Sequence, residues 1–155
     1  MGQYSALKTA LKALIGGIDG SPSYTIDLSA SDAVSQERFS RDSSALIPRA
    51  YLTPGSPAVQ YRSRTDYNDL GSFGSVASFD LAIVVEPADG SNGARVLAAE
   101  LAMDDLIKAL GSNQDLSGTA LSVEASLDVI QGSELGSSDY GIVFGTITAL
   151  FLEVF

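Results

Sequence analysis

The sequence contains no cysteine, no histidine and no tryptophan. Without cysteine, neither a disulfide framework nor a thiolate metal site is possible. Without histidine, the chain lacks the commonest general base and metal ligand, and the Ser-His and Cys-His pairs that activate nucleophiles cannot form. The phosphate-binding patterns G-x-x-x-x-G-K-[ST] and G-x-G-x-x-G do not occur either. These absences predict a protein that is not an enzyme and that binds no cofactor.

Positive charge is scarce. Nine Lys and Arg residues stand against nineteen Asp and Glu residues, which gives a formal net charge of −10. A negative net charge is unfavourable for a protein that binds the phosphate backbone of nucleic acids, so we expect no specific nucleic-acid binding. Five of the nine basic residues lie close together in one stretch of the chain, namely Arg38, Arg41, Arg49, Arg62 and Arg64. The rest of the chain is therefore more acidic than its average.

Long hydrophobic runs are also missing. The apolar run at residues 140–152 includes glycines and threonines and is shorter than the roughly 20 residues that a membrane-spanning helix needs. The leucines near the N-terminus are interrupted by Lys8 and Lys12, unlike the apolar core of a secretory signal. With 155 residues, 45% hydrophobic and 18% charged, the chain is typical of one globular domain. We expect a single domain over residues 1–155 and no contact with a membrane.

Two segments have the spacing of amphipathic helices. The first carries an apolar stripe that Gly16 and Gly17 follow, and the stripe consists of Leu7, Leu11, Leu14 and Ile18. The second, residues 94–110, begins after the turn sequence ADGSNG, which offers capping side chains, and is followed by Gly111. Its stripe consists of Val96, Ala99, Met103, Leu106 and Leu110.

Alternating apolar residues predict strands at residues 23–29, 76–86 and 119–129. The inward side chains of the second of these are Ala77, Phe79, Leu81, Ile83 and Val85, and Pro87 ends it. Those of the third are Leu121, Val123, Ala125, Leu127 and Val129. Residues 30–75 have a weaker pattern and contain Pro48, Pro54 and Pro57, so we expect an arm or loop there that holds edge strands at most.

The closing strand, residues 140–155, is apolar on both faces. One face carries Tyr140, Ile142, Phe144, Leu150, Leu152 and Val154, and the other carries Val143, Ile147, Ala149, Phe151 and Phe155. Since an antiparallel strand with one solvated face should alternate, this strand is predicted to be covered on both sides by helices, a second layer or another subunit. The elements together predict an α+β fold of two layers, with two helices packed on a mainly antiparallel sheet of about four to six strands.

The second helix carries the acidic residues Glu100, Asp104 and Asp105. They could form half of a magnesium site, but adjacent carboxylates diverge by about 100° around a helix. An exposed acidic helix face is therefore the preferred interpretation, and no metal site is predicted.

The order of the elements resembles the tail terminator, or tail-completion, proteins of tailed bacteriophages. The resemblance rests on the helix LKALIGGI, the strand YTIDLS, the arm ERFSRDSSALIPRAYL, the helix ARVLAAELAMDDLIKAL and the two closing strands, and it covers the whole chain. It implies a small α+β virion protein of the phage neck or tail, assembled in the host cytoplasm. In this family, the subunits form a closed hexameric ring that caps the tail tube and offers a surface to the head-completion or connector protein.

Such a ring needs two different patches that meet between neighbouring subunits. The candidates for the subunit interface, or else for the core, are Ile142, Phe144, Phe151 and Phe155. The candidates for contacts to adjacent virion proteins, or else for a solvated arm, are Arg38, Arg41, Arg62 and Arg64. The acidic surplus suits a tube through which DNA slides without sticking.

Two other functions remain open. One is another phage neck or tail protein, such as a head-tail connector or a tube subunit, and a tube subunit would polymerise instead of closing. The other is a monomeric α+β domain whose open sheet face binds a small apolar ligand in a pocket lined by Phe79, Phe144 and Phe151.

Overall fold

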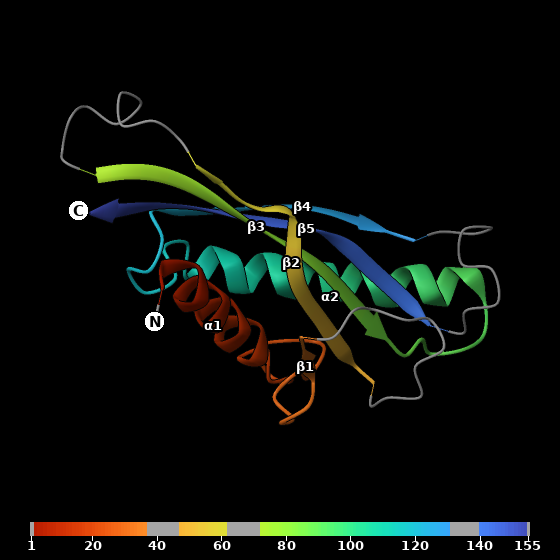
Figure 1. Cartoon of the computed structure of the whole chain (residues 1–155). Coiled ribbons are helices and arrows are strands. Elements are labelled where there is room, and N and C mark those ends of the chain that lie inside the picture. The colour runs from red at the N-terminus through yellow and green to blue at the C-terminus, as the bar shows by residue number, and fades with distance from the viewer. Residues whose placement is uncertain (1, 37–46, 62–71, 131–139, 155) are drawn as a thin grey trace.

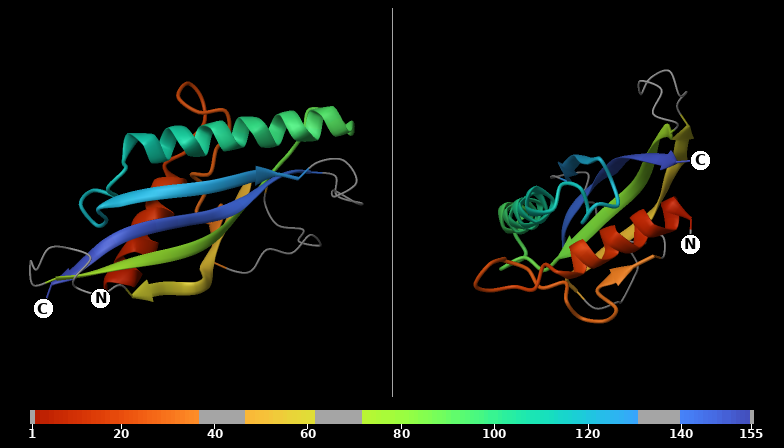
Figure 2. Two further views of the ribbon diagram at one scale, coloured as in Figure 1. Left: turned by 90° about the horizontal axis from the view of Figure 1, so that it is seen from above. Right: turned by 90° about the vertical axis from the view of Figure 1, so that its left-hand side faces the viewer.

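The computed structural model of the chain describes residues 2–36, 47–61, 72–130 and 140–154 (Figure 1). In chain order the elements are α1 (Gln3–Gly16), β1 (Val34–Ser35), β2 (Arg49–Tyr61), β3 (Ser72–Val85), α2 (Asn92–Ser112), β4 (Ser122–Val129) and β5 (Gly141–Val154). The strands form one sheet in the order β1-β2-β3-β5-β4. β1 pairs with β2 in parallel, and the other pairs are antiparallel. Both helices lie on the same face of this sheet (Figure 2), which is the α+β fold that the sequence predicts.

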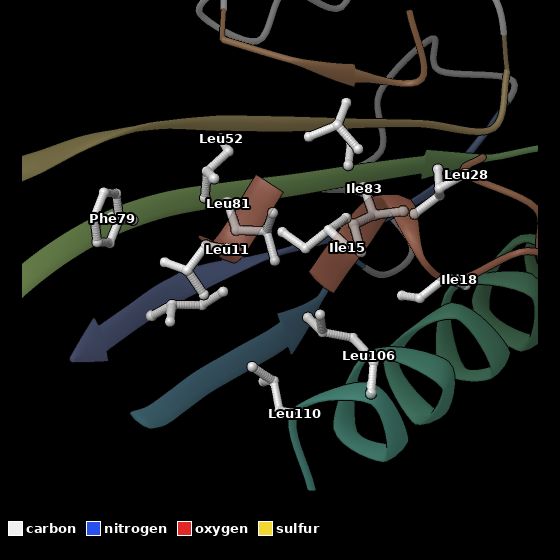
Figure 3. Packing of buried hydrophobic residues seen from close by; sticks show 14 of the residues in the cluster. Leu11, Ile15, Ile18, Leu28, Leu52, Phe79, Leu81, Ile83, Leu106 and Leu110 are labelled. Atoms are coloured by element: carbon white, nitrogen blue, oxygen red, sulfur yellow. The ribbon is translucent and has the colours of Figure 1, made fainter. Parts of the chain in front are cut away.

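The main core lies between the two helices and the sheet (Figure 3). α1 buries Leu7, Leu11 and Ile15 against it. The inward face that the sequence predicts for β3 is buried at all five positions, Ala77, Phe79, Leu81, Ile83 and Val85. Along α1, Ile15 takes the buried place predicted for Leu14, which is only half-buried. The hydrophobic periodicity of these elements therefore defines the side of the sheet on which the helices pack.

α2 begins where its capping sequence predicts. Ser91 is the N-cap, and its Oγ accepts a hydrogen bond from the Ala94 N–H at 3.2 Å. The Asp89 carboxylate accepts the Ser91 N–H at 2.8 Å, and its hydrogen bonds with Ser91 lower the pKa of Asp89. Beyond the C-terminal end of α2, the turn that follows this helix is hydrogen-bonded to the start of α1. The Gln3 side chain donates to the Thr119 carbonyl oxygen at 2.9 Å.

A glycine allows α2 to pack close to the sheet. Gly141 is the first residue of β5, and a Cβ added there would lie 2.5 Å from the carbonyl oxygen of Arg95 and 3.1 Å from the Ala99 nitrogen. Both of these atoms belong to the backbone of α2. A larger residue at position 141 would therefore push the helix away from β5.

Two segments differ from the sequence prediction. Residues 23–29 are not a strand, and their only ladder contact in the described structure is an isolated bridge between Asp19 and Asp27. Within residues 30–75, where the sequence predicts an arm or loop with edge strands at most, β2 instead runs as one continuous strand from Arg49 to Tyr61. A shift in the pairing register between Pro54 and Val59 accommodates the prolines.

Tyr4 provides a test of the packing between α1 and the sheet. Its ring stacks on Phe79 with centroids 5.0 Å apart, and its hydroxyl is shielded from solvent and has no hydrogen-bond partner among the described residues. Burial raises the pKa of Tyr4 above its usual 10.0, so the folded state favours the neutral phenol. The resulting stabilisation is present below pH 10.0 and is lost as the pH rises through the folded-state pKa.

We expect Tyr4→Phe to leave the stability at pH 7 unchanged or to raise it by up to about 1 kcal/mol, because an unpaired buried hydroxyl is unfavourable. Above the usual tyrosine pKa, the variant should lose less stability than the wild type. Urea unfolding at pH 7 and at about pH 10.5 measures both effects. A clear loss of stability at pH 7 would show that the hydroxyl makes a favourable hydrogen bond.

Candidate assembly surfaces

The face of the sheet that points away from the helices, called here the open face, is polar in its central rows. Its side chains lie in rows across β3, β5 and β4. In one row Asp80 is opposite Thr146, which is opposite Ser126. In the next row Ser78 is opposite Thr148, which is opposite Glu124. The carboxylates on this face, those of Asp80, Glu124 and Asp128, belong to exposed residues. The open face is therefore an acidic surface rich in hydroxyl groups.

Phe144 lies where the polar rows of the open face meet its apolar end. It is opposite Ala82 on β3 and Asp128 on β4, and its side chain is 41% exposed. A shallow depression of about 490 Å³ beside it is also lined by Asp80 and Ser126. A large aromatic side chain exposed among polar neighbours is a candidate anchor for a protein contact.

A small second hydrophobic cluster covers one end of the open face. Its buried members are Tyr51, Ala82, Val84 and Ile142. The Arg49 guanidinium lies over the Tyr51 ring, with its central carbon 5.2 Å from the ring centroid. Ile142 is therefore part of the protein interior at this end of β5.

The structure separates the predicted interface residues. Phe151 is 2% exposed and belongs to the main core on the helix side of β5, whereas Phe144 points to the opposite side. The prediction that β5 is covered on both faces is correct for the helix side and for Ile142, but not for Phe144. A pocket lined by Phe79, Phe144 and Phe151 cannot form, because Phe144 is on the other face. Five further candidates, Phe155, Arg38, Arg41, Arg62 and Arg64, lie outside the described residues.

The acidic residues of α2 have different environments. Glu100 and Asp104 are exposed, as predicted, but Asp105 is buried, with 6% of its surface exposed. Its Oδ2 accepts the backbone N–H groups of Thr25 and Ile26, each at 2.8 Å. These hydrogen bonds occupy two of the backbone N–H groups that a strand at residues 23–29 would otherwise donate to a neighbouring strand. Among the described residues no group of acidic side chains could hold a metal ion.

Lys108 supports the same loop. Its Nζ donates to the Ser23 carbonyl oxygen at 2.5 Å and lies 5.1 Å from the centroid of the Tyr24 ring.

The burial of Asp105 could have been predicted from the sequence, but treating the three acidic residues of α2 as one exposed face overlooks it. Asp105 is three residues after Ala102 and four before Ala109, and both alanines are buried, so helical spacing places it on the packed side of α2.

An apolar groove runs between this loop and the N-terminal half of α2. It has a volume of about 430 Å³, and its lining includes Ile26, Val85, Pro87, Leu97 and Leu101. Leu97 is 57% exposed and Leu101 is 37% exposed. Sequence reasoning missed this groove because it followed the buried stripe of α2, and the two leucines lie on another side of the helix.

No model of a known protein family matches the chain, and no curated protein matches its sequence. In the part of the chain that the structure describes, neither helix is both long and apolar enough to cross a bilayer. The open face with Phe144 and the groove beside α2 are the surfaces from which a function can be inferred.

Proposed function

We propose that the chain is a tail terminator, a structural virion protein of a tailed bacteriophage that closes into a ring, caps the tail tube and joins it to the head-completion proteins. The observation that carries this proposal is the order and packing of the elements. The chain begins with an amphipathic helix, continues through strands to a second helix and ends with two strands. The strands form one sheet, and both helices pack on the same face of it. The resemblance to that family rests on the same order of leading helix, second helix and closing strands, although the strand that it includes at residues 23–29 is a loop in the structure.

The open face supports the same function. A ring through which DNA passes needs surfaces that do not retain DNA. The exposed carboxylates of Asp80, Glu124 and Asp128, within a chain of net charge −10, repel a phosphate backbone. Hydroxyl side chains between them, such as Thr146 and Thr148, add polarity without positive charge.

Native mass spectrometry and negative-stain imaging of the purified chain over a range of concentrations test this proposal. We expect a discrete closed ring, with six subunits as in the family that the sequence resembles. Filaments that keep growing with concentration would indicate a tube subunit, because a head-to-tail contact that does not close forms an open helix. A monomer at every concentration would contradict a ring that forms without the tail tube.

A further inference from the structure

The groove beside α2 is apolar inside and acidic around its opening. Glu86 lines it, and Asp104 lies one helical turn beyond Leu101 on the exposed side of α2, with Glu100 nearby. The side chains of the two cations closest to it in the chain are held by backbone carbonyl oxygens of the same subunit, which fix their positions without cancelling their charge. Arg95 donates through Nη2 to the Gly90 carbonyl oxygen at 2.6 Å, and Lys108 donates to Ser23. The groove therefore fits a surface that carries positive charge and has side chains small enough for Leu97 and Leu101 to pack against.

Helix α1 presents such a surface. Its only charged side chains are Lys8 and Lys12, and it contains no acidic residue. Its buried side faces the core, and the small residues Ser5, Thr9 and Ala13 are exposed on its outer side. A helix face of small side chains lets the leucine ridge of another helix approach closely. Of the two described helices, α1 alone has a charge opposite to the groove.

The two surfaces lie on different parts of the molecule. α1 sits beside the C-terminal half of α2, while the N-terminal half of α2, which carries the groove, extends away from it (Figure 1). One copy can therefore bind a neighbour through α1 and a second neighbour through its groove. This is a heterologous contact, the kind that generates a closed ring when its rotation closes.

We propose that the groove beside α2 receives α1 of a second copy of this chain, with Lys8 and Lys12 facing Glu86, Glu100 and Asp104. The inference rests on the proposed ring and names its subunit contact. Leu97 and Leu101 supply the apolar part of the contact. The opposite charges set its orientation and make it sensitive to salt.

Charge reversal tests this contact. The paired changes Lys8→Glu with Lys12→Glu, and separately Glu100→Lys with Asp104→Lys, should each raise the concentration at which half of the chains are assembled by at least about tenfold. All four changes in one chain should restore assembly, since the charges are exchanged and not lost. Asp115→Lys, an exposed charge reversal beyond the end of α2, is the control and should leave the midpoint unchanged. Circular dichroism confirms that each variant is folded.

A second measurement locates the contact directly. A zero-length carbodiimide reagent joins amines to carboxylates, and a mixture of ¹⁵N-labelled and unlabelled chains identifies links between copies. We expect links from Lys8 or Lys12 to Glu86, Glu100 or Asp104 of another copy. Rings that lack these links and tolerate the charge reversals would overturn this contact and leave the terminator proposal standing. Links within filaments would support the contact and count against a terminator. A chain that never self-associates would overturn this contact and a ring that forms without the tail tube.

Discussion

Phe151→Ala is expected to lower the free energy of unfolding by about 3–5 kcal/mol, whereas Phe144→Ala should lower it by less than about 1 kcal/mol. The two residues are on the same strand, but Phe151 is buried in the main core and Phe144 is 41% exposed on the opposite face. Removing the Phe151 ring leaves a cavity among packed neighbours, while removing the Phe144 ring exposes little new surface. Urea unfolding followed by circular dichroism measures both changes.

The different burial of Phe144 and Phe151 also determines which of the two can be substituted in a study of assembly. An aspartate at position 151 would unfold the subunit, so it says nothing about an interface. Phe144→Asp should leave the subunit folded and therefore reports on the open face alone. If Phe144→Ala lost more stability than Phe151→Ala, the strand would have the opposite face towards the helices, since a shift of one residue exchanges the two faces.

Asp105→Ala should lower the free energy of unfolding by about 2–3 kcal/mol, because hydrogen bonds to a charged group are stronger than neutral ones and two backbone donors lose their shared acceptor. The variant loses the acceptor for the N–H groups of Thr25 and Ile26. Asp104→Ala is a matched control, because it makes the same change on the next residue of the helix, where the side chain is exposed. It should change stability by no more than about 0.5 kcal/mol. Thermal unfolding of the two variants gives the comparison.

Hydrogen exchange distinguishes a local role for Asp105 from a general one. In Asp105→Ala, the amides of Thr25 and Ile26 should exchange faster even under conditions where the chain is fully folded. Unchanged exchange at both amides, or equal destabilisation by the two alanine variants, would show that the carboxylate does not hold the loop.

The elements with strong periodicity could be predicted from the sequence. α1, α2 and β3 each carry an apolar stripe at regular spacing, so their positions and the faces that pack in the main core follow from residue spacing. Residues 23–29 also alternate between apolar and polar side chains, although they form a loop and not a strand. Leu28 is buried and Tyr24 and Ile26 pack partly against the core, so the alternation belongs to a loop that lies along the core. Spacing alone cannot separate this case from a strand.

The candidate surfaces were only partly predictable. The sequence places Phe144 and Phe151 on opposite faces of β5, because their positions differ by an odd number. It does not show which face the helices cover, since both faces are apolar and only the packing of α1 and α2 decides. The groove depends on a loop held to α2 by Asp105, a contact between residues 80 positions apart. Local patterns carry no information about such a contact.

The attachment of the N-terminal segment has a consequence for the order of folding. The loop at Thr25 is held by a residue 80 positions later, and Gln3 at the start of α1 bonds to a carbonyl 116 positions later. During synthesis α1 leaves the ribosome long before either partner exists. Contacts that close such long loops are slow to form, so the first helix made should be among the last elements to dock. Until then its leucines remain exposed, and the newly made chain passes through a stage at which it is prone to aggregate.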